Sequence, residues 1–422
     1  MHLPSGALQI IKQLENKGFS AYIVGGCVRD IILERNPNDW DITTNALPTD
    51  IKKIFQYTYD TGIAHGTVTV ILNDQHFEVT TYRVENQYND YRRPSSVDFV
   101  NNIEEDLSRR DFTMNAIAYH PDKGFVDPYN GITDIEHRII RAVGDPTVRF
   151  TEDALRILRA IRFSAQLNFY IDQNTQDALI RTKHLLQFIS KERIRDEFNK
   201  ICLSDFTDSF GFFKYQNVIV KIYDWQILPY ISEYINDIFN KLDDEKISDL
   251  LQALDKMPTN LISRYSTLLY LAQSGDYTKE ALKDLKFDNH TIKNVVIFCK
   301  YFFDISQKIN TIDRIELKRL LGQCGIQNLN NILKLLEINA HLSNEIYDEQ
   351  KIVNLKYEIK DILLKAECYT VKDLAITGHD LKELNIATGK EIGVKLNEAL
   401  EFVFKFPKKN HKFDILNYLV TQ

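Results

Sequence analysis

Residues 21–44 of the chain read AYIVGGCVRDIILERNPNDWDITT, and this stretch decides the fold of the N-terminal region. Its apolar start predicts a short β-strand that runs directly into Gly25 and Gly26, after which a helix is expected to begin. Pro37 marks a turn, and a second, acidic strand is expected over residues 39–44. Strand, glycine pair, helix, turn and acidic strand form a specific order of elements.

Two aspartates, Asp39 and Asp41, begin the acidic strand. Side-chain direction repeats every two residues along a strand, so both carboxylates are expected on one face. Two like charges this close need a positive partner, and Mg²⁺ commonly binds through one or two carboxylates together with substrate phosphates. Gly25 and Gly26 let the backbone approach a phosphate closely, and Arg29 is placed to pair with it. The stretch therefore predicts a metal-dependent site for a nucleoside triphosphate, with Asp39 and Asp41 as the metal ligands.

Each part of this stretch has a simpler explanation when it is taken alone. An isolated Asp-x-Asp is most often a solvated turn, and an isolated Gly-Gly pair is usually only a turn. A dinucleotide-binding Rossmann fold is excluded by pattern, because Gly25 and Gly26 are not followed by the third glycine of that fingerprint. The order of the elements is what favours the triphosphate site.

The composition is that of an ordinary soluble globular protein, with 44% apolar and 26% charged residues among 422. This length predicts two to four domains. We expect no signal peptide and no transmembrane segment. The five scattered cysteines predict reduced thiols in the cytoplasm, with neither a disulfide framework nor a zinc site. The net charge of −7 does not exclude RNA as a partner, because a local basic cleft can lie on an acidic protein.

Strand and helix patterns are mixed over the first 150 or so residues. The β-branched runs 65–72 and 77–82 are separated by the turn residues Asn73 and Asp74, and they predict a hairpin beside the acidic strand. From Thr151 onward, apolar residues recur with helical spacing. The expected fold class is therefore α+β, with a small mixed sheet and helices in an N-terminal head, followed by an all-helical remainder.

Glu78 lies in the second strand of this hairpin and is a candidate third carboxylate. In-line nucleotidyl transfer uses acidic residues around a pair of magnesium ions, one of which activates the attacking hydroxyl while the other holds the triphosphate and the departing pyrophosphate. Asp111 competes with Glu78 for this catalytic position, and the sequence leaves the choice open.

Residues 82–110 are rich in Asn, Tyr, Arg and acids, and they predict a mobile surface loop with a functional role. The loop ends at Arg109 and Arg110, which are followed by Asp111. The paired arginines can bind phosphates, and Asp111 can accept a hydrogen bond from a ribose hydroxyl.

Residues 151–163, TEDALRILRAIRF, predict a helix with Thr151 as its N-cap and acids in its first turn. Asp153 and Arg156 are three residues apart, so we expect them to be neighbours on one helix face. The carboxylate can accept from the amino group that cytosine and adenine share, while the guanidinium donates to a ring acceptor. Guanine and uracil present an oxo group there and would be rejected. The basic residues form a winding strip around the helix: Arg156, Arg159 and Arg162.

Over roughly its first 200 residues the chain closely resembles the class II, bacterial-type tRNA CCA-adding enzymes of the DNA polymerase β-like nucleotidyltransferase superfamily. The motifs that carry the resemblance are GGxVRD at 25–30, DxD at 39–41, RRD at 109–111, EDxxR at 152–156 and KERI at 191–194. Farther along, TGHDL at 377–381 and GxxIG at 389–393 look like the tail of that family.

The resemblance implies that the chain adds and repairs the 3′-terminal CCA of tRNA without a nucleic-acid template, using CTP and then ATP and releasing pyrophosphate. It implies Mg²⁺ as the cofactor, bound by Asp39 and Asp41. The nucleotide contacts that it implies are Gly26, Arg29, Arg110, Asp153, Arg156, Arg159 and Arg162. Glu192 and Arg193 are implied to brace helices without touching the substrate.

Four domains are implied by the same resemblance. We place a catalytic head at 1–137, a nucleotide-selecting neck at 138–205, a body at 206–310 and a tail at 311–422. The acceptor and TψC arm of tRNA would lie along the body and tail, where residues 405–412 form a basic cluster that is as well explained by a solvated terminal segment. We expect neither DNA nor a membrane as a partner, and the sequence does not decide between a monomer and a homodimer.

Related activities are the main alternatives. Poly(A) polymerases and enzymes that add only CC or only A share the head motifs, but the segment 82–110 looks complete, whereas CC-only members have it shortened. A catalytically inactive RNA-binding protein is disfavoured, because Asp39, Asp41, Asp153 and Arg156 are all present.

Overall fold

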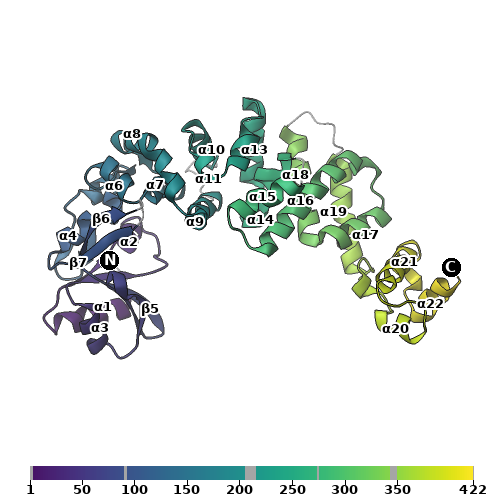
Figure 1. The fold of residues 1–422 in the computed structure, drawn as a ribbon, viewed down its shortest axis with the longest axis horizontal. Helices are drawn as coiled ribbons and strands as arrows, with labels where there is room; N and C mark the ends of the chain where they lie inside the picture. The colour runs from purple at the N-terminus through teal and green to yellow at the C-terminus, as the bar shows by residue number, and fades with distance from the viewer. Residues whose placement is uncertain (1–2, 90–92, 205–214, 273–274, 343–348, 422) are drawn as a thin grey trace. The chain divides into compact units, whose positions relative to one another are not determined.

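A computed structural model of the chain describes residues 3–89, 93–204, 215–272, 275–342 and 349–421 (Figure 1). The chain divides into two compact units, Met1–Ile231 and Ser232–Gln422. The first unit contains a mixed β-sheet with helices, and the described part of the second is helical. The predicted α+β head with a helical remainder is thus confirmed.

The sheet of the first unit has seven strands among the described residues, in the order β3-β4-β5-β2-β1-β8-β9. β2 and β5 run parallel, and the other neighbours are antiparallel. The strands are β1 (Ala21–Val24), β2 (Asp41–Thr44), β3 (Thr58–Gly62), β4 (Thr67–Leu72), β5 (Gln75–Thr81), β8 (Ala118–His120) and β9 (Gly124–Val126). The predicted hairpin is confirmed as β4 and β5, and it lies beside the acidic strand β2.

Helical segments pack around this sheet. α2 (Gly26–Ile32) follows β1 directly and contacts it, as the glycine pair predicted. The others in this region are α1 (Ser5–Glu15), α3 (Pro48–Ile54), η1 (Ile63–His65), α4 (Ile103–Ser108), η2 (Thr113–Asn115) and α5 (Gly131–Glu136). One buried apolar cluster joins β1 and β8 to α4: Val24, Leu107, Ala116, Ala118 and Val143.

The expectation of a loop over residues 82–110 is wrong for most of that segment. β6 (Arg83–Asn89) and β7 (Arg93–Phe99) form an antiparallel pair, and α4 follows them. The polar residues that suggested a loop instead make contacts: Arg83 pairs with Glu85 at 3.0 Å, and the side chain of Asn102 accepts from the backbone of Glu104 to cap α4. Residues 90–92, at the turn, lie outside the described residues.

The helix expected over 151–163 is two helices, α6 (Pro146–Glu152) and α7 (Leu155–Leu167). Thr151 lies inside α6 and is not an N-cap; Asp145 caps α6, and Pro146 occupies its first turn. Asp153 lies between the helices with extended backbone, φ −136° and ψ 101°, and its Oδ1 accepts from the backbone N of Leu155 at 3.1 Å. This extended backbone interrupts the helical path between α6 and α7.

The rest of the first unit is mostly helical. α7 contacts α9 and α10. The segments are α8 (Gln173–Thr182), η3 (Lys183–Phe188), α9 (Lys191–Cys202), α10 (Tyr215–Asp224) and α11 (Leu228–Ile231). The predicted all-helical neck is wrong at one point, because β10 (Ile139–Ile140) and β11 (Tyr170–Ile171) form a short parallel pair. These two-residue strands are too short to give a periodic pattern.

The second unit contains only helical segments among its described residues. They are α12 (Glu233–Phe239), α13 (Asp244–Lys256), α14 (Leu261–Leu269), η4 (Tyr270–Ala272), α15 (Gly275–Asp284), α16 (Asn289–Lys308), η5 (Ile309–Thr311), α17 (Arg314–Cys324), α18 (Ile326–Leu342), α19 (Glu349–Leu364), η6 (Val371–Asp373), α20 (Gly378–Glu383), α21 (Glu391–Lys405), η7 (Pro407–Lys409) and α22 (Lys412–Val420). Leu381, Ala399, Val403 and Ile415 belong to one buried cluster that joins the last three helices.

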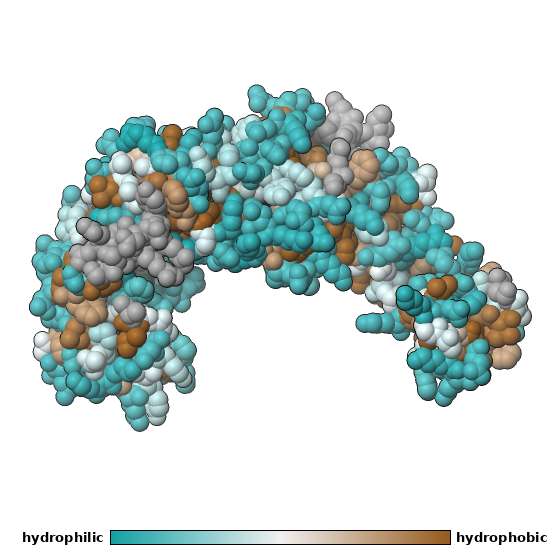
Figure 2. Space-filling model, in the orientation of Figure 1, coloured by the Kyte–Doolittle hydropathy of each residue, from teal (hydrophilic) through white to brown (hydrophobic). Residues whose placement is uncertain are grey.

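Polar residues dominate the face of the molecule that Figure 2 shows. Within the described ranges, no helix is both long and apolar enough to cross a membrane. All five cysteines are free and buried in the structure.

Candidate active site

Three predicted carboxylates are brought together by the sheet. Asp41 is the first residue of β2, and Glu78 of β5 is its partner in the parallel register. Register partners project from the same face of a sheet, and adjacent strands lie about 4.8 Å apart. Asp39 precedes β2 by two residues and acts electrostatically on Asp41, as does Glu78. The geometry therefore favours Glu78, which lies on the strand next to Asp41, as the third carboxylate.

Burial raises the pKa of the Asp41 carboxyl to about 6. The positive charge of Arg110 opposes this rise, whereas the negative charges of Glu78 and Asp39 add to it. A divalent cation beside these groups would offset the repulsion and favour the ionised carboxylate at neutral pH.

Gly25 lets the chain turn sharply beside this acidic group. Its backbone has φ 84° and ψ −135°, a conformation that is essentially restricted to glycine. A β-carbon at this position would lie 2.8 Å from Nη1 of Arg110 and 3.8 Å from Oδ2 of Asp41. The missing side chain therefore leaves room for the arginine and the carboxylate beside the first turn of α2.

The donor set fits magnesium. In the part of the chain that the structure describes, no group of three His, Cys, Asp or Glu side chains is arranged to hold a metal ion. Mg²⁺ is commonly held by only one or two carboxylates together with substrate phosphates. Asp39 and Asp41 supply hard oxygen ligands of this kind, and the turn at Gly25 provides close backbone access for a phosphate.

Arg110 is held at this site by a buried carboxylate that the sequence did not single out. Asp106 in α4 is fully buried and accepts from Arg109 at 2.8 and 3.0 Å and from Arg110 at 3.4 Å. It also accepts from Oγ1 of Thr43 in β2 at 3.2 Å. Of the two predicted phosphate-binding arginines, Arg110 is thus the one that lies beside Asp41.

A continuous chain of hydrogen bonds runs from α2 to α7. Arg29 is buried; its Nε and Nη2 donate to Asp30 at 2.9 and 2.7 Å, and its Nη1 donates to Asn115 at 2.8 Å. Asn115 in turn donates to Oδ1 of Asp111 at 3.0 Å. Oδ2 of Asp111 accepts from Nε and Nη2 of Arg159 at 2.8 and 2.6 Å. The helix after the glycines and the predicted nucleotide-selecting helix are therefore tied together.

Asp111 is ionised at neutral pH although its side chain is buried. Burial would raise its pKa, but the guanidinium of Arg159 and the hydrogen bond from Asn115 outweigh this and bring the pKa to about 2. Both of its oxygens accept from protein donors, so the geometry favours Asp111 as the partner of Arg159 and leaves the third catalytic carboxylate to Glu78.

Asp153 and Arg156 lie at the junction of α6 and α7, where other charged groups hold them. Both Nη atoms of Arg193, in α9, donate to the Asp153 carboxylate at 2.9 and 3.3 Å. Arg156 is buried, and it donates to Glu152 at 2.8 Å and to the backbone oxygen of Arg109 at 3.0 Å. Arg193 thus braces Asp153 from the neighbouring helix, in the way that the family resemblance implied.

Arg162 is buried beside an acid of α9. Its Nε lies 3.3 Å from Oε2 of Glu197, although neither atom has a hydrogen-bond partner. Burial lowers the pKa of Arg162 to about 10; Glu197 opposes this change and Arg159 adds to it. The Nε–H group of Arg162 has no hydrogen-bond acceptor among the described residues of the protein.

Three further residues of this site were missed from the sequence: Asp106, Asn115 and Phe163. All three lie inside or beside the motifs, but each also has a contact distant in sequence: Asp106 with Thr43, and both Asn115 and Phe163 with Arg29. Asn115 binds Arg29, which lies 86 residues away, and no periodic pattern predicts such a contact.

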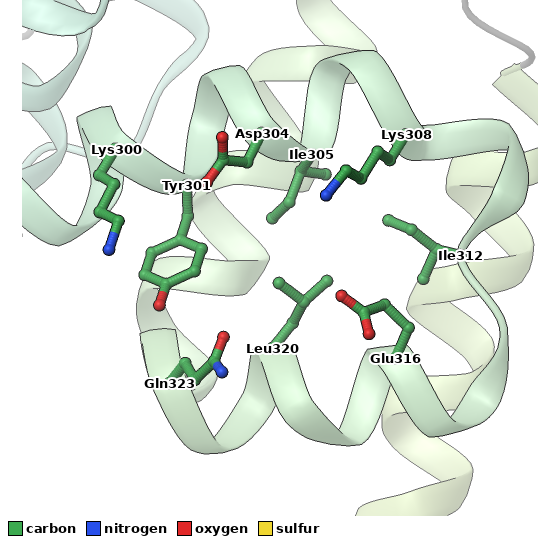
Figure 3. A pocket seen from close by; sticks show the side chains of 9 residues that line it. All are labelled: Lys300, Tyr301, Asp304, Ile305, Lys308, Ile312, Glu316, Leu320 and Gln323. Carbon is green, nitrogen blue, oxygen red and sulfur yellow. The ribbon is translucent and has the colours of Figure 1, made fainter. Parts of the chain in front are cut away.

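A separate cavity of about 250 Å³ lies in the second unit between α16 and α17 (Figure 3). Ile305, Ile312 and Leu320 supply its apolar lining. Two lysines and two acids also line it, so its charge is balanced: Lys300, Lys308, Asp304 and Glu316. It contains none of the predicted site residues.

We expect Gly25→Ala to lower kcat by about tenfold or more. The new methyl group would press on Arg110 and force a backbone strain of roughly 1–3 kcal/mol next to the candidate metal ligands. Steady-state kinetics of nucleotide incorporation, together with the melting temperature, test this. The matched control is Gly18→Ala, because Gly18 also has positive φ (86°) but has open space around it. Wild-type kcat in Gly25→Ala would contradict the assignment.

Comparisons with known proteins show what the chain is similar to. Three family models match the chain: "Poly A polymerase head domain" at residues 21–141, "Probable RNA and SrmB- binding site of polymerase A" at 168–210, and tRNA nucleotidyltransferase domain 2 at 258–419. The CCA-adding enzyme of Bacillus stearothermophilus, solved in complex with CTP, is similar in structure with a TM-score of 0.78 and 28% identity, over 100% of this chain and 98% of that one.

Curated relatives match over almost the whole length. The CCA-adding enzyme of Lactobacillus helveticus is 38% identical over 98% of this chain and 96% of the relative. That of Anoxybacillus flavithermus is 36% identical over 94% of this chain and 90% of the relative. Sequence, structure and site geometry lead to one conclusion: the chain belongs to the family of CCA-adding enzymes, which are tRNA nucleotidyltransferases with a poly(A) polymerase-type head.

Proposed function

We propose that the chain adds and repairs the 3′-terminal CCA of tRNA without a nucleic-acid template, using CTP and then ATP. The observation that carries the chemistry is the pairing of Asp41 with Glu78 next to Arg110 and the Gly25 turn. The relative from Bacillus stearothermophilus was solved with CTP, which supports CTP as a substrate.

The reaction is attack of the tRNA 3′-hydroxyl on the α-phosphate of the incoming nucleotide. An O–P bond forms to the 3′-oxygen, the bond between the α-phosphorus and its bridging oxygen breaks, and pyrophosphate leaves. Asp39 and Asp41 would hold Mg²⁺ beside Glu78, and the metal when bound would lower the pKa of the hydroxyl and offset negative charge on the triphosphate. The hydroxyl proton passes to water. Gly26 and Arg110 bind the triphosphate.

Base choice is assigned to the start of α7. Asp153 accepts from the amino group common to cytosine and adenine, and Arg156 donates to a ring acceptor of the same base. Their support by Arg193 and Glu152 favours this reading, because a protein template must hold its donors and acceptors in place before the nucleotide arrives. Arg29, Arg159 and Arg162 complete the nucleotide site.

We retain the division into head, neck, body and tail at residues 137/138, 205/206 and 310/311 as a proposal. The tRNA acceptor and TψC arm would lie on the body and tail. We place the enzyme in the cytoplasm, and the five free cysteines support that location. Poly(A) polymerase, partial addition and inactive RNA binding remain the alternatives that an assay must separate.

The direct test is an extension assay with three tRNAs that end at the discriminator base, at C and at CC. Each is supplied with CTP, ATP or both, and the products are sequenced. The proposal requires completion of CCA on all three and arrest after the terminal A. Long adenosine tails would favour a poly(A) polymerase, products that stop at CC would favour a CC-adding enzyme, and tRNA binding with no product would favour an inactive protein.

Asp39→Ala and Asp41→Ala should each lower incorporation by about a thousandfold or more while leaving tRNA affinity nearly unchanged. Each change removes a carboxylate that holds the metal, a contribution of several kcal/mol to the transition state. Single-turnover rates and a tRNA filter-binding assay measure the two effects. Asp60→Ala serves as the control, since Asp60 is an exposed carboxylate in β3 of the same sheet and pairs with Lys52. Full turnover in either site variant would contradict the assignment of Asp39 and Asp41 as metal ligands.

The double variant Asp153→Ala with Arg156→Ala should relax base choice more than it weakens triphosphate affinity, because the two side chains meet the base and not the phosphates. Incorporation of all four nucleotides under competition, with the KM of each, measures this. Asp153→Asn alone should reduce selectivity with little change in packing. An unaltered preference for CTP and ATP in the double variant would contradict the assignment of Asp153 and Arg156 as the residues that select the base.

A further inference from the structure

One aromatic ring lies at the centre of the arginines assigned to the nucleotide. Phe163, in α7, is 6% exposed. The guanidinium carbon of Arg162 lies 4.3 Å from the centroid of its ring, that of Arg29 lies at 5.1 Å, and that of Arg159 lies at 5.4 Å. All three distances fall within the range of cation–π attraction, about 6 Å.

These arginines come from two separate elements. Arg29 lies in α2, directly after the glycine turn, whereas Arg159 and Arg162 lie in α7. The ring therefore joins the phosphate side of the site to the nucleotide-selecting helix. It does so in addition to the hydrogen-bonded chain through Asn115 and Asp111.

Three guanidiniums around one point repel one another, and carboxylates offset this only in part. Arg29 pairs with Asp30 at 2.7 Å and Arg159 with Asp111 at 2.6 Å, but the Nε of Arg162 lies 3.3 Å from Glu197 without a hydrogen bond. The negative face of an aromatic ring attracts cations without occupying their N–H donors. It can thus hold guanidiniums together and leave donors for an incoming anion.

We propose that Phe163 is a positioning residue that holds Arg29, Arg159 and Arg162 as one preset receptor for the incoming nucleotide. This inference rests on the proposed function, which assigns those arginines to the nucleotide. Phe163 acts through the arginines and touches neither base nor phosphate. Loss of the ring should therefore lower the affinity for CTP and for ATP by the same factor. The preference of the enzyme for these two nucleotides over UTP and GTP should stay unchanged.

Fluorination of the ring tests this with almost no change in size. The full chain is prepared with phenylalanine, 4-fluoro-, 3,5-difluoro- or 3,4,5-trifluorophenylalanine at position 163, and CTP is titrated by calorimetry with Mg²⁺. Each fluorine withdraws charge from the ring face, so the affinity should fall step by step, by about tenfold across the series, which corresponds to about 1.4 kcal/mol. ATP should show the same trend.

Phe112 provides the matched control. It is fully buried and meets Phe163 edge-on, with ring centroids 5.9 Å apart, and within the described residues no guanidinium lies over its ring. The same fluorinated series at Phe112 should leave the affinity for CTP unchanged. Phe163→Leu, which keeps an apolar side chain but removes the π face, should lose affinity like the trifluoro form.

The outcomes separate this inference from the function on which it rests. A wild-type chain that binds CTP, with equal affinity in every fluorinated form at position 163, overturns the role of Phe163 alone. A shift in melting temperature across the series with constant affinity also overturns it, because the ring would then be only structural. A wild-type chain that does not bind CTP contradicts the proposed function and the receptor together.

Discussion

Crowded negative charge at Asp41 is the constraint around which the head is built. The parallel pairing of β2 with β5 brings Glu78 beside Asp41, and Asp39 lies two residues away. Burial and repulsion raise the pKa of Asp41 to about 6, so the folded chain holds an acidic site that a cation would stabilise. Gly25 and Arg110 are arranged beside this carboxylate, and Asp106 holds the arginine. A bound Mg²⁺ would supply the positive charge that this arrangement calls for.

Nucleotide transfer and nucleotide choice are assigned to different elements, and a small set of polar contacts couples them. Asp111 lies in the segment that follows the paired arginines of the head, and Arg159 lies in α7. This ion pair, together with the hydrogen bond that Arg29 donates to Asn115, fixes the position of the start of α7 relative to the glycine turn. A displacement of this contact would move the base-reading residues relative to the triphosphate. In the proposed function, this coupling would let one site hold the α-phosphate and the base edge, which lie at opposite ends of one nucleotide, at the same time.

Local patterns made much of this structure predictable. The strand, glycine pair, helix and acidic strand follow from residues close in sequence, as does the hairpin that places Glu78 next to Asp41. The failures have physical reasons as well. The polar segment 82–110 was expected to be a loop, but its charges pair with one another across β6 and with α4. The break at Asp153 was missed because the extended backbone of one residue interrupts an otherwise continuous helical pattern. Asn115 and Phe163 contact residues far away in the chain, and no short-range pattern reports that kind of contact.

Anomalous diffraction from crystals of the full chain grown with CTP and Mn²⁺ would test the central assignment most directly, since Mn²⁺ substitutes for Mg²⁺ and can be located by its own scattering. We expect an anomalous peak in contact with Asp39 and Asp41, the triphosphate beside Gly26 and Arg110, and the cytosine amino group facing Asp153. A metal peak away from the two aspartates, or a base that lies away from the start of α7, would contradict it.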